Sequence, residues 1–347
     1  MSDKKFVMTV VSIVVALTLA FGSFNFFIDP MWTFAHEHEL NDVQTVIDER
    51  EQKTSQVYFQ DFNYDTILVG SSRSTYVDPH QFEGMDVFNY SVSNLSMREY
   101  RTMIDYALEE SDGNLERVIL GVDFFKSSEQ EASQPKSILN YVSKVEERFY
   151  RYKNLLSLDV FDYTVQNVEM SASDDVKLER VYDRQNTADA AQLSEEEVQQ
   201  DTDDKIERFR DVFYGENYEY YSRYKEIMEL VKTDHPSLEY IVYTTPISTE
   251  LFKVLAEEGH MDDYEQWLRD LVDIYGGVFN FMYPNSITNN IYNYFDGHHF
   301  YPEVGDHIAH TISGNTENTP DDFGVYVTKE NIDQHLEEVN ALVDELD

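Results

Sequence analysis

Three polar residues near the two ends of the chain have the types and spacing that nucleophilic catalysis needs. Ser72 follows the apolar run and turn glycine of residues 67–71 (ILVGS). Asp296 and His299 lie three positions apart, so that one turn can direct both side chains into one cleft. A serine hydroxyl is a weak nucleophile at neutral pH, and it needs a base that a third group orients. Ser72, His299 and Asp296 therefore form a candidate triad.

Each half of this set also has an ordinary interpretation. Gly-Ser-Ser is a common turn, and residues 296–299 (DGHH) can equally be a polar loop with surface histidines. The two halves together favour the triad. Spacing alone leaves open whether His298 or His299 is the base.

The chain resembles the SGNH (GDSL-like) hydrolase superfamily. The resemblance is greatest to its membrane-anchored branch, which includes D-alanyl-lipoteichoic acid biosynthesis and alginate O-acetylation proteins. The family's first block, Gly-(Asp/Ser/Asn)-Ser after strand one, matches Gly70 to Ser72, and its last block, Asp-x-x-His, matches Asp296 to His299. The resemblance covers residues 60–315. It implies Ser72 as the nucleophile, His299 as the base and Asp296 as the residue that orients it.

The middle blocks depart from the family pattern. Residues 87–94 (VFNYSVSN) lack the oxyanion glycine, so Asn89 and Asn94 become the candidate donors. Asp123 stands where the family has an oxyanion asparagine, and an ionised carboxylate cannot donate a hydrogen bond. Arg73, beside the nucleophile, is a candidate anion clamp, with a surface arginine as the alternative.

These residues must be positioned by a parallel sheet. Apolar runs that predict strands occupy residues 66–69, 87–90, 117–122, 240–244 and 278–281. Strands that alternate with helices predict a flavodoxin-like α/β/α domain with a five-stranded parallel sheet. The carboxyl ends of parallel strands share one edge, where ligands bind, and Ser72 and Asp296 both follow predicted strands.

The predicted organisation has four parts. Residues 1–28 are a cytoplasmic stub and transmembrane anchor, 29–60 a membrane-proximal linker helix, 61–315 the SGNH-like domain with a helical insertion at about 126–235, and 316–347 an acidic C-terminal helix. The linker helix is predicted from the spacing of Leu40, Val43, Val46 and Ile47.

Residues 6–28 carry no charge and are long enough to cross a bilayer, which takes about 20 residues. Lys4 and Lys5 precede them and favour an amino terminus inside the cell, with the remaining chain extracytoplasmic. A cleaved signal peptide is the alternative. Trp32 and Phe34 follow the apolar segment at a place where aromatic residues occupy the membrane interface.

The charge of the chain excludes one class of partner. It has 67 acidic and 26 basic residues, a net charge of −41, so attraction to nucleic-acid phosphates has the wrong sign. Such an excess of carboxylates resembles proteins that work in high salt, where screening relieves self-repulsion. The absence of cysteine excludes disulfides and thiol chemistry.

No cofactor or metal is predicted. A zinc site at His298, His307 and His310, and a half-site at His36 and His38, are the weaker interpretations of the histidines.

The sequence thus predicts a membrane-anchored extracytoplasmic serine esterase or O-acyltransferase that acts on acyl esters of a cell-surface polysaccharide or polymer. A membrane-bound acyltransferase is the expected protein partner. Two alternatives are a non-catalytic SGNH-like scaffold that binds such a polymer or partner and, more weakly, a metal-dependent phosphoesterase.

Overall fold

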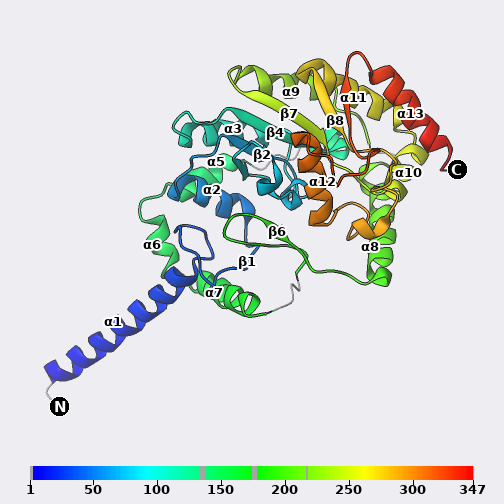
Figure 1. Cartoon of the computed structure of the whole chain (residues 1–347). Coiled ribbons are helices and arrows are strands. Elements are labelled where there is room, and N and C mark those ends of the chain that lie inside the picture. Colours follow the sequence, from blue (N-terminus) through cyan, green and yellow to red (C-terminus); the bar gives the residue numbers. More distant parts are fainter. Residues whose placement is uncertain (1–2, 133–136, 174–177, 216–217, 347) are drawn as a thin grey trace. The chain divides into compact units, whose positions relative to one another are not determined.

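The computed structural model describes residues 3–132, 137–173, 178–215 and 218–346 (Figure 1). Its internal contacts divide the chain into two compact units. Unit 1 contains Met1–Phe62 and Leu139–Gln185, and unit 2 contains Asn63–Ile138 and Asn186–Asp347. The segment predicted as one insertion, 126–235, is therefore shared between the two units.

A six-stranded mixed sheet forms the centre of unit 2. Its strands are β2 (Thr66–Val69), β3 (Val87–Asn89), β4 (Arg117–Val122), β7 (Glu239–Thr244), β8 (Gly277–Asn280) and β9 (Val325–Thr328). Their order is β3-β2-β4-β7-β8-β9; neighbouring strands are parallel except β8 and β9, which are antiparallel.

The α/β class is confirmed, but the prediction of a five-stranded, wholly parallel sheet is wrong. The sixth strand, β9, lies within residues 316–347, the segment predicted as an acidic C-terminal helix. Only four residues long and flanked by acidic residues, it gives a weak local signal. Its pairing with β8 supplies the hydrogen bonds that define it as a strand.

The central strands of unit 2 form where the chain is continuously aliphatic. In β2 and β4, Ile67, Leu68, Val118 and Ile119 are fully buried, as is typical of parallel strands covered on both faces. Residues 66–69 and 117–122 match the predicted strands exactly. Because β2, β3, β4, β7 and β8 run in the same direction, their carboxyl ends share one edge.

Helices connect these strands. Those of unit 2 are α3 (Glu99–Glu110), α4 (Glu129–Ala132), α8 (Glu195–Arg208), α9 (Tyr224–Thr233), α10 (Thr249–Glu257), α11 (Met261–Tyr275), α12 (Pro302–Ser313) and α13 (Ile332–Asp344); the two-residue strand β6 (Ala188–Asp189) precedes α8. Helix α8 begins with a capping box, in which Ser194 and Glu197 satisfy each other's backbone amides. It continues into a π-helical turn, Phe209–Phe213.

Unit 1 contains α1 (Asp3–Ile28), β1 (Gln44–Thr45), α2 (Glu49–Phe59), α6 (Tyr150–Asn154), α7 (Leu158–Ser171) and β5 (Val181–Tyr182), together with most of α5 (Ile138–Val145). Strand β1 pairs with β5 in antiparallel register, Gln44 opposite Tyr182.

The predicted helix over the linker, residues 29–60, is wrong in its first half. Asp48 caps α2, its carboxylate accepting the amides of Arg50 and Glu51, so the helix begins only at Glu49. The apolar residues that suggested a helix precede this cap.

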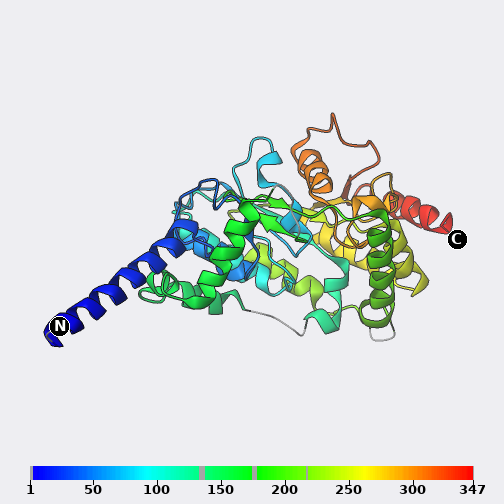
Figure 2. The same ribbon diagram turned by 90° about the horizontal axis from the view of Figure 1, so that it is seen from below.

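Helix α1 is long and apolar enough to span a membrane. It extends away from the rest of unit 1 in both ribbon views (Figures 1 and 2). Most of its side chains are exposed, whereas Asn25 and Ile28 near its carboxyl end are buried.

Candidate active site

Ser72 lies just beyond the carboxyl end of β2, in a turn that requires glycine. A Cβ on Gly70 would lie 2.1 Å from Ser74 Oγ and 3.1 Å from the Gly121 carbonyl oxygen on β4. Only a residue without a side chain lets the chain pass this close to its neighbours. The turn leaves Ser72 half-buried between two buried neighbours, Ser71 and Arg73.

A tight loop holds Asp296 and His299. Tyr294 and Phe300 form an antiparallel bridge around it, and the Phe295 amide donates to the His299 carbonyl at 2.9 Å. Asp296 Oδ1 accepts the backbone amides of His298 and His299 at 3.0 and 2.7 Å. The loop therefore fixes the carboxylate before its side-chain partners are considered.

The structure brings Ser72, His299 and Asp296 into one hydrogen-bonded chain. Ser72 Oγ lies 2.9 Å from His299 Nε2, and His299 Nδ1 lies 3.0 Å from Asp296 Oδ2. An Nδ1–H that donates to Asp296 leaves Nε2 as an acceptor for the serine proton. This arrangement is that of a nucleophile, a base and an orienting carboxylate.

His298, the alternative base, has a different environment. Its buried ring packs between Phe125 and Phe209, with centroids 5.3 and 5.0 Å away. Burial, and then the charge of Arg73, hold the pKa of His298 well below its usual value, so the ring is neutral at pH 7. The geometry therefore places His299, and not His298, against the serine.

A further charged residue, Lys205, completes the environment of Asp296. Lys205 Nζ lies 2.6 Å from Asp296 Oδ2, the same oxygen that faces His299. Burial alone raises the pKa of Asp296, but the charge and hydrogen bond of His299, followed by the charge of Lys205, lower it well below the usual range. Sequence reasoning missed Lys205, because a lone lysine in the acidic run of α8 reads as a solvated surface residue.

Arg73 is not the open anion clamp that the sequence suggested. Its side chain is 1% exposed and forms an ion pair with Asp123, which is equally buried. Arg73 also donates to the Thr245 carbonyl oxygen at 3.3 Å, and the Thr245 hydroxyl donates to Asp123. This network joins the turn after β2 to the ends of β4 and β7, so Asp123 compensates the charge of Arg73 and does not face a substrate.

Asn89 is likewise committed to the turn. Its side-chain amide donates to the carbonyl oxygens of Ser74 and Val77, both at 2.9 Å, and its Oδ1 accepts the Ser91 amide at 3.0 Å. A fully buried side chain with these partners cannot serve as an oxyanion donor. Asn94 remains the exposed side-chain candidate; its Oδ1 accepts from Lys126, and its φ of 54° belongs to the left-handed region.

An aromatic wall, which we define as Phe125, Phe209, Phe213 and Tyr214, packs through Phe125 and Phe209 on His298, the neighbour of the base. Phe125 contacts both Phe209 and Phe213, with ring centroids 5.7 and 5.2 Å apart. Three of its four members belong to the π-helical turn after α8 or directly follow it, and π-turns are frequent at functional sites. The segment that provides Lys205 thus also provides most of this aromatic packing, in which Phe125, Phe209 and Tyr214 are buried.

Within the described residues, no group of three His, Asp or Glu side chains converges on a point that could hold a metal ion. Two of the three histidines in the weaker zinc interpretation have other partners. His298 packs among aromatic rings, and His310 Nε2 lies 3.1 Å from Gln81 Oε1.

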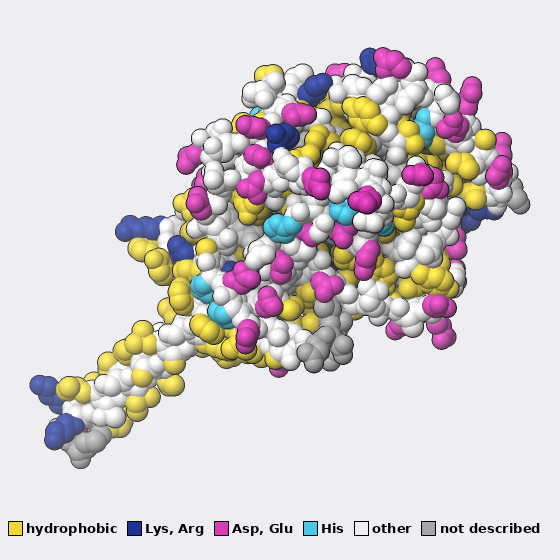
Figure 3. Space-filling model, in the orientation of Figure 1, with side chains coloured by type: hydrophobic (Ala, Val, Ile, Leu, Met, Phe, Trp, Pro, Cys, Tyr) yellow, Lys and Arg dark blue, Asp and Glu magenta, His cyan; other side chains and the backbone are white. Residues whose placement is uncertain are grey.

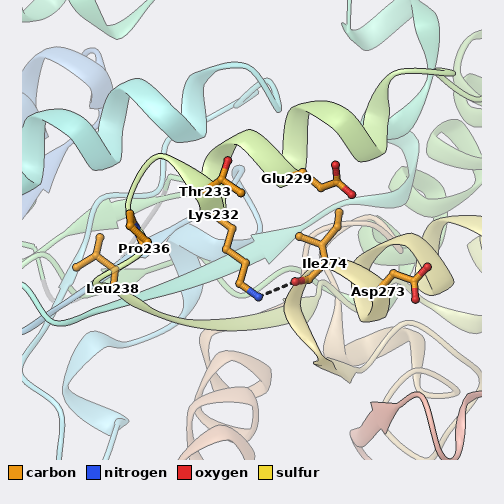
Figure 4. A pocket seen from close by; sticks show the side chains of 7 residues that line it. All are labelled: Glu229, Lys232, Thr233, Pro236, Leu238, Asp273 and Ile274. Atoms are coloured by element: carbon orange, nitrogen blue, oxygen red, sulfur yellow. Dashed lines mark hydrogen bonds between the residues drawn. The ribbon is translucent and has the colours of Figure 1, made fainter.

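A separate cavity of 410 Å³ lies beside the amino end of β7 (Figure 4). It is lined by Glu229, Lys232, Thr233, Pro236, Leu238, Asp273 and Ile274. Leu238 immediately precedes β7, so the cavity lies at the amino end of that strand, opposite to the end that Ser72 occupies. Lys232 Nζ donates to the Ile274 carbonyl oxygen at 2.6 Å, a structural bond.

A scan against protein-family models and a search of curated proteins found no match for this chain.

Proposed function

We propose that the protein is a membrane-anchored serine esterase or O-acyltransferase of the SGNH type. Its substrates would be acyl esters of an extracytoplasmic cell-surface polysaccharide or similar polymer. The observation that carries the proposal is the continuous hydrogen-bonded chain from Ser72 through His299 to Asp296. The five parallel strands, with Ser72 after the first of them, support a flavodoxin-like relationship on which the SGNH resemblance depends.

The chemistry follows from the atoms in contact. Ser72 Oγ attacks the acyl carbon as its proton passes to His299 Nε2, and a tetrahedral oxyanion forms. Asp296 holds the imidazole in the required tautomer and stabilises its charged form. His299 then returns the proton to the leaving alcohol, which leaves an acyl group on Ser72.

Backbone amides of the turn at Ser72 are the proposed oxyanion donors, with Asn94 as a side-chain donor. Asn89 and Asp123 are excluded from this role by their buried structural partners. An oxyanion hole made mainly of backbone amides does not need the asparagine or glycine of the family blocks.

The acceptor of the acyl group decides between the two activities. Water would give an esterase, and a sugar hydroxyl would give a transferase. Phe125, Phe209 and Tyr214 of the aromatic wall are buried, so they shield the neighbouring His298 from water and do not select between the two acceptors.

The proposed location follows from α1. Lys4 and Lys5 before an apolar helix favour an inside amino terminus and an extracytoplasmic catalytic unit. A membrane-bound acyltransferase would then be a suitable donor of acyl groups.

The test is covalent labelling of the full-length chain in detergent with a fluorophosphonate probe, in low and high salt. We expect wild type to be labelled and Ser72→Ala to lose labelling. We also expect Ser72→Ala to lose on the order of 10³-fold or more of any ester hydrolysis, because triad residues act as a unit.

The matched control is Ser71→Ala, which removes a hydroxyl next to the nucleophile. Ser71 Oγ is buried and has no hydrogen-bond partner among the described residues, so its loss should leave labelling unchanged. No labelling of a folded wild-type protein would reject the activated serine and favour the scaffold alternative, which the structural roles of Asn89 and Asp123 motivate.

A further inference from the structure

Apolar side chains gather on the outside of one part of unit 1. The four most exposed large apolar side chains outside α1, in the part of the chain that the structure describes, are Leu158 (73%), Tyr152 (58%), Phe149 (57%) and Leu156 (57%). They fall within ten consecutive positions and are here called the 149–158 surface. Clustered exposed apolar groups of this kind mark interaction sites in folded proteins.

The local backbone turns these side chains outward. Phe149 has a φ of 70° and caps α6 from the left-handed region, which is costly for a bulky aromatic residue. The next residue, Tyr150, points inward and donates its hydroxyl to Glu51 Oε1 at 2.6 Å. Anchoring Tyr150 in this way leaves Phe149 and Tyr152 on the outer side.

The 149–158 surface adjoins the last turns of the apolar helix α1. Asn25 Nδ2 donates to the Leu155 carbonyl oxygen at 3.1 Å, and the Thr164 hydroxyl donates to Asn25 Oδ1 at 2.9 Å. A Cβ on Gly22 would lie 3.4 Å from Leu156 Cδ2. Leu156 therefore sits against α1 within two turns of its carboxyl end.

Aromatic packing fixes the same contact from α7. Phe161 stacks on Phe21 with centroids 5.0 Å apart and meets Phe24 edge-on at 5.8 Å. The start of α7 is thus packed against α1. Leu158, one turn before Phe161 on α7, is exposed.

The sequence around this surface is less acidic than the whole chain. Residues 139–162 contain four basic and four acidic residues, whereas acidic residues outnumber basic ones by 67 to 26 in the full sequence. The guanidinium of Arg148 lies 4.7 Å from the centroid of the Phe149 ring, and the exposed Lys153 side chain forms an ion pair with the equally exposed Glu147 at 2.8 Å. Exposed aromatic and leucine residues beside Arg and Lys are typical of segments that lie in the headgroup region.

We propose that the 149–158 surface is a second membrane contact, which inserts into the headgroup and acyl boundary beside α1. Phe149, Tyr152, Leu156 and Leu158 would face lipid chains, and Arg148 would meet lipid phosphates. The contact with α1 indicates that lipid covers this surface. When α1 spans the membrane, residues packed against the last two turns of α1 lie at the depth of the bilayer. In Figure 3, apolar atoms continue from α1 onto the adjoining part of unit 1, with Lys and Arg side chains beside them. This contact is independent of the proposed esterase chemistry.

The sequence allows a clean test, because it contains no cysteine. Leu156→Cys and Leu158→Cys, each in the full-length chain, are labelled with an environment-sensitive fluorophore and reconstituted in vesicles of phosphatidylcholine and phosphatidylglycerol. Leu230→Cys on α9, also an exposed leucine, is the matched control in unit 2. Brominated acyl chains then report the depth of each label.

We expect several-fold stronger quenching at positions 156 and 158 than at 230, with a depth of roughly 5–10 Å below the headgroups. Equal, weak quenching at all three positions would overturn the proposal. Quenching that appears only at a very high ratio of lipid to protein would also overturn the proposal. It would show that a second copy of the chain, and not lipid, covers the 149–158 surface at ordinary protein density.

Discussion

At the scale of single residues, the candidate site depends on one carboxylate with several donors. Asp296 receives two backbone amides on Oδ1, and His299 and Lys205 on Oδ2. Such a carboxylate stays ionised and fixed, which is what a base needs from its orienting partner. Lys205 also lowers the pKa of Asp296, which helps to keep the orienting carboxylate ionised as the pH falls.

Replacing Lys205 should therefore change the pH dependence of the reaction. In Lys205→Met, loss of the positive charge raises the pKa of Asp296, so the orienting carboxylate is protonated at a higher pH and the acid limb of the kcat/KM profile should move to higher pH. Lys205→Arg keeps the charge and should restore the wild-type profile. An unchanged profile in Lys205→Met, measured by fluorophosphonate labelling rate against pH, would refute this positioning role.

The buried pair of Arg73 and Asp123 makes a prediction about stability. Asp123→Leu leaves the Arg73 guanidinium buried without its counter-charge, and should lower the free energy of unfolding by about 3–5 kcal/mol. The double variant Arg73→Met, Asp123→Leu removes both charges and should recover much of this loss. Denaturant titration measures both effects.

The exposed pair of Arg223 and Glu226 is the control for that experiment. Both side chains are more than half exposed, and removing the pair should change stability by less than about 1 kcal/mol. A loss in Asp123→Leu no larger than this would contradict a structural ion pair at the site.

At the scale of secondary-structure elements, each catalytic side chain is held by an element with other bonds of its own. The turn after β2 is held by the Asn89 amide and the Arg73 network, and α8 is held by its capping box.

Helix α13 packs beside β9, which is itself paired to β8. A buried histidine joins α13 to the sheet, because Asn280 Nδ2 on β8 donates to His335 Nε2 at 2.8 Å.

This histidine should make the protein sensitive to acid. Burial lowers the pKa of His335 to about 4, against a usual value of 6.5, so the unfolded chain binds more protons between these values. The stabilisation is complete above about pH 6.5 and is lost as the pH falls through about 4, by at most about 3 kcal/mol. His335→Gln should flatten the decline of stability between pH 6.5 and 4, measured by thermal unfolding.

His80 provides the comparison for His335. It is exposed, so His80→Gln should leave the slope of stability against pH as in the wild type. Equal slopes in the wild type and in His335→Gln would show that His335 is not the group responsible. Neutral, buried His298 contributes acid sensitivity of the same sign.

At the scale of the whole molecule, the net charge of −41 dominates the electrostatics. Self-repulsion favours expansion, and salt screens it, since the Debye length falls from about 10 Å at 0.1 M to about 3 Å at 1 M. The midpoint of thermal unfolding should therefore rise as sodium chloride increases from about 0.1 to about 1 M. An uncharged osmolyte at matched osmolality is the control, and a midpoint that stays constant or falls in salt would contradict the screening argument.

Local pattern alone determined much of the molecule. The runs at 66–69 and 117–122 are buried strands because a continuous aliphatic segment needs cover on both faces. Ser194 and Glu197 define a helix start through bonds within a single turn. The apolar helix at the amino end and the excess of carboxylates are likewise properties of neighbouring residues or of composition. Motif and family resemblance point to Ser72, Asp296 and His299 without any knowledge of their geometry.

Other features were decided only by tertiary structure. Strand β9 exists because β8 supplies its hydrogen bonds, and Lys205 meets Asp296 because α8 brings it there. Arg73, Asp123 and Asn89 were predicted to contact substrate. In the folded chain they are buried: Arg73 pairs with Asp123, and Asn89 holds the turn after β2. Each depends on residues far apart in sequence, whose proximity no local periodicity encodes. The spacing of Asp296 and His299 indicated that a histidine acts as the base. Only the fold decides which one, because it places His299 against Ser72 and packs His298 among aromatic rings.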